Sequence, residues 1–163
     1  MATEHDQRSR LAVVITVSDR SAQGKRADES GPLGARMLRE AGWQTEVAVV
    51  PDEADAIVHA VREAASQGAR LIVTTGGTGV GPRDVTPQAC APLLRLGLPG
   101  IAERVRAAGK VPTAALSRGL AGVVGDALLV NLAGSTGAVR DGMPVILDVA
   151  AHTIAQLDGG DHA

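Results

Sequence analysis

The sequence has almost no aromatic residues. Trp43 is the single aromatic side chain among 163 residues, and neither phenylalanine nor tyrosine occurs. Proteins that bind single-stranded nucleic acid stack bases on aromatic side chains, so such a platform cannot be built here. The chain also carries no basic block, and its formal net charge of -2 argues against a general nucleic-acid binder. The core of the protein must be aliphatic.

Cysteine is equally scarce. Cys90 is the only one, which excludes a disulfide within the chain and any zinc or iron–sulfur site built on several cysteines. The four histidines are scattered, and none stands in an H-x-x-x-H or H-x-E motif. No apolar run is long enough to cross a membrane, and residues 1–10 are polar and charged, unlike a signal peptide. These absences predict a cytoplasmic protein with no membrane partner.

What the sequence does contain is an alternation of apolar runs and amphipathic stretches. Apolar residues make up 45% of the chain, and its length suits one compact domain over residues 11–157, between polar tails at 1–10 and 158–163. Residues 11–17 are β-branched and apolar on both faces, which is typical of a strand buried in a parallel sheet. The pattern predicts further strands at residues 43–50, 70–75, 114–116, 121–124 and 127–130, and helices at residues 33–41, 52–67, 86–94, 101–108 and 136–157.

The order of these elements predicts the fold class. Strands that alternate with helices form a mainly parallel sheet with helices on both faces. The dipeptide Gly125-Asp126 separates the last two predicted strands by two residues, which suits a β-hairpin. We therefore expect an α/β protein, a three-layer α/β/α sandwich with a mainly parallel central sheet and a small late β-hairpin.

Polar segments follow four of the predicted strands. In open α/β sheets, ligands collect beyond the carboxyl ends of the strands, and parallel neighbours bring those ends to one edge. We expect the polar segments to converge there. They cover residues 18–20, 51–53, 76–84 and 131–135.

The glycine-rich segment TTGGTGVGPRDVTP at residues 74–87 is the most informative of these. Glycines allow a ligand to approach the main chain, and successive N–H groups can form a nest for phosphate oxygens. The segment is not a P-loop, because Pro82-Arg83 stands where Lys and Ser/Thr are required, and Pro82 also breaks a G-x-G-x-x-G motif. Glycine density alone leaves a merely tight strand-to-helix turn as an open alternative.

Asp52 and Asp84 are the acidic candidates. A carboxylate near phosphates is useful mainly as a ligand of Mg²⁺, since without a cation it would repel the anion. The position of Asp52 alone favours an ordinary helix N-cap, and Asp84 could instead form an Asx-turn or pair with Arg83. Asp19 next to Arg20 could likewise be a surface ion pair.

Other polar residues permit both a functional and a plain interpretation. Ser117 and Arg118 could offer a hydroxyl and a guanidinium to a phosphate, or they could form a simple turn. Asp28 could belong to a solvated loop. Cys90 is expected in the core rather than as a nucleophile, because no histidine follows nearby.

Taken together and in order, these segments resemble the Mog/MoaB family of molybdenum-cofactor biosynthesis. The resemblance extends from about residue 11 to residue 155, and one departure is Ala133, where the family usually has proline. The matching stretches are residues 16–20 (TVSDR), 28–32 (DESGP), 50–53 (VPDE), 75–79 (TGGTG), 83–87 (RDVTP), 99–100 (PG), 116–118 (LSR) and 131–134 (NLAG).

The resemblance implies a nucleotidyltransferase that binds Mg-ATP and molybdopterin, transfers AMP to the pterin's terminal phosphate and releases pyrophosphate. By position, Asp52 and Asp84 match the family's catalytic acidic pair and are the expected Mg²⁺ ligands. The other predicted molybdopterin- or nucleotide-binding residues are Ser18, Asp28, Gly76, Gly77, Thr78, Gly79, Ser117, Arg118, Asn131, Gly134 and Ser135. The resemblance also implies a homotrimer, and a molybdate-insertion protein as the partner that uses the product.

Two other functions stay open. A non-catalytic pterin-binding or scaffold protein of the MoaB kind would share the fold, although the presence of both Asp52 and Asp84 favours the catalytic branch. An unrelated phosphosugar or nucleotide enzyme could also use a glycine loop of this kind.

Overall fold

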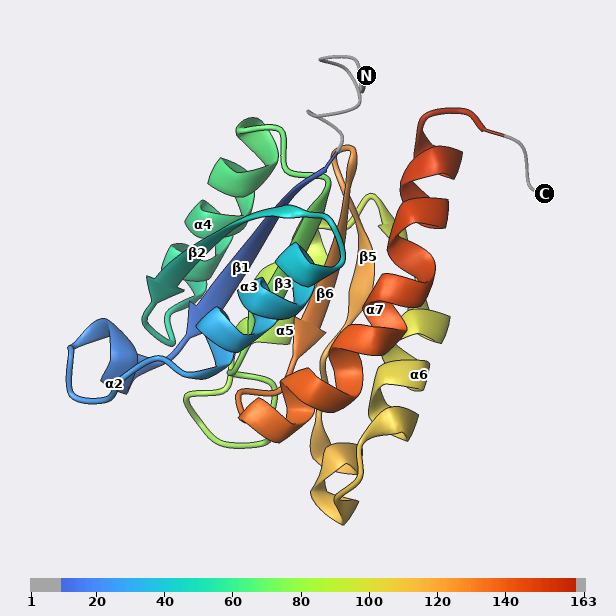
Figure 1. Ribbon diagram of the computed structural model, residues 1–163. Helices are drawn as coiled ribbons and strands as arrows, with labels where there is room; N and C mark the ends of the chain where they lie inside the picture. The colour runs from blue at the N-terminus through green and yellow to red at the C-terminus, as the bar shows by residue number, and fades with distance from the viewer. Residues whose placement is uncertain (1–9, 161–163) are drawn as a thin grey trace.

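The computed structural model describes residues 10–160, in which strands and helices alternate along most of the chain (Figure 1). Residues 1–9 and 161–163, which hold nearly all of the predicted N-terminal tail and half of the predicted C-terminal tail, lie outside the described residues. The elements in chain order are β1 (Leu11–Val17), α2 (Asp19–Ala22), α3 (Ser30–Glu40), β2 (Gln44–Val50), α4 (Ala54–Ser66), β3 (Leu71–Thr75), α5 (Thr86–Cys90), η1 (Ala91–Leu93), β4 (Leu96–Gly97), α6 (Pro99–Ala108), η2 (Pro112–Leu116), β5 (Ala121–Val124), β6 (Ala127–Leu132) and α7 (Thr136–Leu157).

The strands form one sheet in the order β2-β1-β3-β6-β5-β4. Strands β2, β1, β3 and β6 are parallel neighbours, whereas β5 runs antiparallel to β6 and to the short β4. One row of the register pairs Val14 with both Val47 and Val73, and Val73 with Val130. The predicted mainly parallel sheet and its late hairpin are confirmed.

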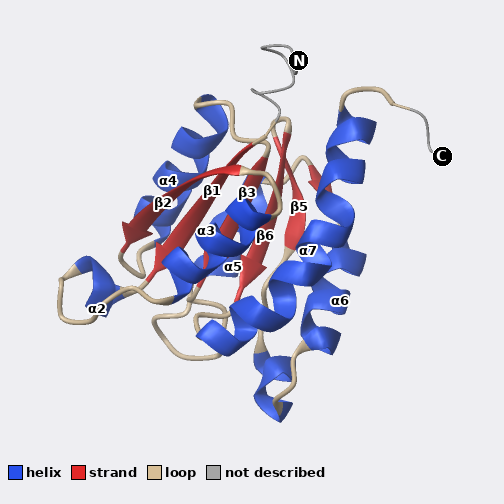
Figure 2. Ribbon diagram, in the orientation of Figure 1, coloured by secondary structure: helices blue, strands red, loops and turns tan. Residues whose placement is uncertain are grey.

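Helices cover both faces of the sheet (Figure 2). Because side chains alternate along a strand, Val14 of β1 packs with Leu38 of α3 and Met143 of α7, whereas Ile15 faces Ile57 of α4 on the other side. The two cores are aliphatic, as the lack of aromatic residues required. This arrangement is the predicted three-layer α/β/α sandwich.

Several local predictions were wrong. The predicted strand at residues 114–116 is part of the 3₁₀ helix η2, which begins at Pro112, a residue that favours the first turn of a helix. The predicted helix at 86–94 divides into α5 and η1. The short elements α2 and β4 were not predicted, and their lengths of four and two residues offer no periodic pattern to detect. Within residues 10–160, none of the helices combines the length and apolar character that crossing a membrane requires.

Candidate active site

The carboxyl ends of the parallel strands bring the polar segments together, as predicted. The amide of Ser18 after β1 donates to the carbonyl of Val50 at the end of β2 (2.9 Å). The amide of Gly76 after β3 donates to the carbonyl of Leu132 at the end of β6 (2.9 Å). Four chain segments that are distant in sequence therefore share one edge of the sheet, which is the lower edge in Figure 1.

The glycine loop at residues 76–85 is folded back closely on the ends of the strands. Gly76 and Gly77 have φ values of +99° and +69°, and a Cβ at Gly76 would collide with the carbonyl oxygen of Val17. The hydroxyl of Thr86 donates to the carbonyl of Gly76 (2.9 Å), and the Thr86 amide donates to the carbonyl of Gly77 (3.0 Å). The dipeptide Thr86-Pro87 is typical of an N-cap followed by a first-turn proline and predicts that Thr86 caps α5. This prediction was wrong, because the N-cap position belongs to Val85. The Thr86 side chain holds the loop instead.

Asp52 is not the N-cap of α4 either. That position belongs to Glu53, and the Asp52 carboxylate turns away from the helix to accept the amide of Asp19 through Oδ2 (2.9 Å). Its other oxygen, Oδ1, faces the glycine loop, since a Cβ at Gly77 would lie 3.3 Å from it. Burial raises the pKa of Asp52. The backbone amide of Asp19 opposes this rise, and the negative charges of Asp19 and Asp84 add to it.

Asp84 closes a tight turn within the glycine loop. Its Oδ2 accepts the amide of Gly81 (2.8 Å), and its own amide donates to the carbonyl of Gly81 (3.0 Å). An Asx-turn would bond the Asp84 carboxylate to an amide two residues later, so both plain alternatives, the Asx-turn and the pairing with Arg83, were wrong. Arg83 pairs with Asp19, which consequently does not form the expected surface pair with Arg20. The two candidate acids thus lie at the same edge of the sheet, close enough for the charge of Asp84 to affect Asp52.

Arg118 holds the glycine loop from the other side. Its amide donates to the carbonyl of Thr78 (2.8 Å), its Nε to the carbonyl of Gly79 (2.8 Å) and its Nη2 to the carbonyl of Asp84 (2.8 Å). The guanidinium predicted to bind phosphate is therefore engaged with the loop backbone. Both of its hydrogen bonds need the planar fork of arginine, which lysine lacks.

We expect Arg118→Ala to lower kcat for the reaction proposed below by about 10-fold, because residues that hold a site in place have effects of this size. Arg118→Lys should be equally impaired, since it keeps the charge but cannot make both bonds. Steady-state kinetics on the two variants separates the roles: recovery of activity in the lysine variant would mean that the charge acts directly on the substrate.

The remaining predicted residues divide between supporting positions and pocket walls. Asn131 is buried, and its amide donates to the hydroxyl of Thr74 (2.8 Å) and accepts the amide of Leu120 (3.2 Å). Ser117 donates its hydroxyl to the buried Thr78 (3.2 Å). Asn131 therefore supports the ends of β3 and β6 from behind, and Ser117 joins the loop before β5 to the glycine loop.

A polar pocket of about 180 Å³ opens beside β1, α3 and the start of α7, and Ser18, Asp28, Gly134 and Ser135 are among its lining residues. Asp28 accepts the hydroxyl of Thr16 through Oδ2 (2.8 Å) and the amide of Gly31 through Oδ1 (3.0 Å). Asp28 does lie in a largely exposed loop, as one interpretation expected, but its side chain is not free in solvent. Its carboxylate is fixed at the wall of the pocket.

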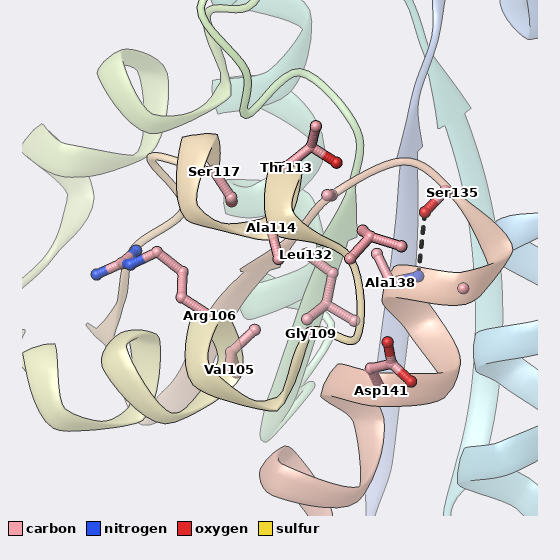
Figure 3. A pocket seen from close by; sticks show the side chains of 13 residues that line it. Val105, Arg106, Gly109, Thr113, Ala114, Ser117, Leu132, Ser135, Ala138 and Asp141 are labelled. Atoms are coloured by element: carbon pink, nitrogen blue, oxygen red, sulfur yellow. Dashed lines mark hydrogen bonds between the residues drawn. The ribbon is translucent and has the colours of Figure 1, made fainter.

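A second pocket, of about 170 Å³, lies between α6, η2 and the start of α7 (Figure 3). Most of the side chains around it are apolar, such as Val105, Ala114 and Leu132. Ser135 lines both pockets, and its hydroxyl caps α7 by accepting the amide of Ala138 (3.0 Å). The two pockets are therefore neighbours. Asp52 and Asp84 line neither of them.

The two candidate acids fit a magnesium ion that arrives with a substrate. In the part of the chain that the structure describes, no three His, Cys, Asp or Glu side chains gather as a metal cage. Mg²⁺ in nucleotide enzymes is usually held by one or two carboxylates together with substrate phosphates and water. Asp52 and Asp84 each use Oδ2 in a backbone hydrogen bond, which leaves Oδ1 without a protein donor among residues 10–160. These two oxygens would hold the ion.

Cys90 lies in the core behind the site, as predicted. Its side chain is fully buried, and burial raises the pKa of the thiol to about 11. The thiolate is the reactive species, so the native protein should be alkylated by iodoacetamide at pH 8 roughly 100-fold more slowly than the unfolded protein. Mass spectrometry with and without guanidinium chloride measures both rates. Rapid labelling of the native protein would contradict this burial.

Comparison with known proteins agrees with this geometry. Residues 13–152 match the family described as "Probable molybdopterin binding domain". The chain is 41% identical over 155 residues to the molybdenum cofactor biosynthesis bifunctional protein of Synechococcus elongatus, covering 93% of this chain and 49% of that protein. It is 37% identical over 147 residues to the molybdopterin adenylyltransferase of Pyrococcus furiosus, covering 86% and 87%.

Solved structures give the same result. The crystal structure of a molybdopterin biosynthesis protein from Mycobacterium abscessus matches with a TM-score of 0.88 and 46% identity, covering 93% of this chain and 98% of that one. The chain spans about half the length of the bifunctional relatives. The chain belongs to the probable molybdopterin binding domain family, which confirms the resemblance to the Mog/MoaB proteins found in its sequence.

Proposed function

We propose that the protein is a molybdopterin adenylyltransferase. It would transfer AMP from Mg-ATP to the terminal phosphate of molybdopterin, giving adenylyl-molybdopterin and pyrophosphate in molybdenum cofactor biosynthesis. The observation that carries the proposal is the meeting of Asp52 and Asp84 at one sheet edge beside the glycine loop. The name of the Pyrococcus furiosus relative, which has nearly the same extent as this chain, supports it.

The chemistry suits what this edge of the sheet offers. An oxygen of the pterin phosphate attacks the α-phosphorus of ATP, and the bond from that phosphorus to the bridging oxygen breaks as pyrophosphate leaves with the electron pair. Because two anions must meet, positioning and charge neutralisation dominate the barrier. The reaction requires no protein nucleophile, and the buried Cys90 offers none.

The chain's own residues have distinct parts in this proposal. Bound Mg²⁺ would supply the neutralising charge, and Asp52 and Asp84 would hold it through their free oxygens. Backbone amides of the glycine loop at residues 76–79 would receive phosphate oxygens. The two neighbouring pockets that share Ser135 would receive the ring systems of the two substrates.

The direct test is an assay with purified protein, ATP, Mg²⁺ and molybdopterin. We expect pyrophosphate and adenylyl-molybdopterin, identified by mass spectrometry, only when all three additions are present. Omitting molybdopterin controls for simple ATP hydrolysis. A protein that binds molybdopterin but releases no pyrophosphate would instead be a non-catalytic pterin-binding or scaffold protein of the MoaB kind.

The proposal extends to the setting of the reaction. The family resemblance suggests a homotrimer, with a molybdate-insertion protein that takes up the adenylylated product. The sequence itself predicts a cytoplasmic location. Light scattering on the purified protein measures the first point, because a trimer has three times the 16.5 kDa mass of one chain.

A further inference from the structure

Asp19 and Asp52 hold each other through two reciprocal hydrogen bonds. The Asp19 amide donates to Oδ2 of Asp52 (2.9 Å), and the Asp52 amide donates to Oδ1 of Asp19 (2.9 Å). The two residues are 33 positions apart in the chain, one after β1 and the other after β2. These two hydrogen bonds fix both the backbone and the carboxylate of Asp52, and so direct its free Oδ1 toward the glycine loop.

Asp19 also binds the glycine loop through its carboxylate. Arg83 donates from Nε to Oδ2 of Asp19 (3.0 Å) and from Nη2 to Oδ1 (3.1 Å). This two-point geometry fixes a guanidinium in place more strongly than a single contact does. Arg83 directly precedes Asp84, so the position of Asp19 is transmitted to the second candidate acid.

The charges of this cluster favour the same arrangement. Asp19, Asp52 and Asp84 place three carboxylates at one edge, and Arg83 forms an ion pair with Asp19. Without Arg83, the mutual repulsion of the carboxylates would push the two loops apart.

We propose that Asp19 is the positioning residue of this site. It orients Asp52 through the reciprocal hydrogen bonds, and through Arg83 it sets the distance of the Asp84 loop from Asp52. We call the set Asp19, Asp52 and Arg83 the aspartate latch. The inference rests on the proposed function, because the geometry that the latch maintains is the one that adenylyl transfer would use.

Variants that remove different parts of the latch test it. Asp19→Ala removes the carboxylate that accepts the Asp52 amide and pairs with Arg83, but keeps the Asp19 backbone amide that donates to Asp52. Asp19→Asn keeps an oxygen that can accept the Asp52 amide, and Arg83→Gln removes only the ion pair. The matched control is Asp158→Asn, which breaks the two-point pair of Asp158 with Arg70 at the opposite end of the sheet. Each variant is assayed for adenylyl transfer, and amide hydrogen exchange is measured without substrates.

We expect Asp19→Ala to lower kcat by about 10- to 100-fold, the usual loss when a residue that orients a metal ligand is removed, with a much smaller change in KM. Asp19→Asn should recover part of this loss. The double variant Asp19→Ala/Arg83→Gln should be no slower than Asp19→Ala, because the two residues act as one unit. The hydrogen of the Asp52 amide should exchange faster in Asp19→Ala than in the wild type. Its exchange rate should be unchanged in Asp158→Asn.

Three results would overturn the latch: wild-type kcat and exchange in Asp19→Ala, an Asp19→Asn variant as slow as Asp19→Ala, or fully additive losses in the double variant. Failure of the proposed function is a separate outcome. It would appear as a wild-type protein that does not transfer AMP, while the exchange of the Asp52 amide still reports on the latch.

Discussion

Asp52→Asn is expected to lower kcat for adenylyl transfer by about 1000-fold, the upper end of the loss seen when one preorganised charge-stabilising group is removed. The amide keeps an oxygen that accepts the Asp19 amide, so the loop should stay folded while the negative charge is lost. Asp84→Asn should have an effect of the same order, because its amide oxygen can still accept the Gly81 amide. Steady-state assays of pyrophosphate release measure both.

The control for charge alone is Asp55→Asn, which removes an exposed carboxylate from the first turn of α4, three residues from Asp52. It should retain wild-type kcat. The thermal unfolding midpoints of all three variants should lie close to that of the wild type, which shows that the loss is chemical. Near-wild-type rates in Asp52→Asn or in Asp84→Asn would remove that residue from the mechanism.

The framework of this site could be predicted from sequence because it depends on long regular elements. The run at Leu11–Val17 is apolar on both faces, and its central position between β2 and β3 explains why. Once the strands are parallel, the meeting of the loops that follow them is a geometric necessity. The convergence of Asp52, Asp84 and the glycine loop followed from that step alone.

The roles of individual side chains could not be predicted, because local preferences compete with distant partners. Asp52 stands where an N-cap is favoured, but a partner 33 residues away occupies its carboxylate. Thr86 likewise bonds a carbonyl ten residues earlier instead of capping α5. In both cases the tertiary hydrogen bond outweighs the local preference for an N-cap, which contributes about 1 kcal/mol to helix stability.

The importance of Asp19 was missed for the same reason. Its neighbour Arg20 suggested a local ion pair, whereas its actual partner Arg83 lies 64 residues further along the chain. One signal was available: Asp19 stands at the carboxyl end of β1, the location where the fold collects functional groups. Polar residues at such strand ends carry more weight than their immediate sequence neighbours do.

Gly76→Ala is expected to reduce the free energy of unfolding by about 3 kcal/mol, the upper end for a strained backbone position. Gly76 has φ +99°, and an added Cβ would collide with the Val17 carbonyl oxygen, which belongs to the end of the neighbouring strand. The collision would force β1 and β3 apart at the edge where the candidate site lies. Adenylyl transfer should therefore be lost together with stability, as urea unfolding and the kinetic assay would show.

Gly68→Ala separates the two causes of this loss of stability, which are the strained backbone conformation and the collision of the added Cβ. Gly68 follows α4 with φ +89°, but nothing lies within 4 Å of the position of an added Cβ. Its substitution should therefore cost only the conformational strain, about 1 kcal/mol, and leave kcat unchanged. The difference between the two variants measures the contact with Val17. Equal losses of stability would mean that backbone conformation, and not the close approach of the two strand ends, is what requires glycine at position 76.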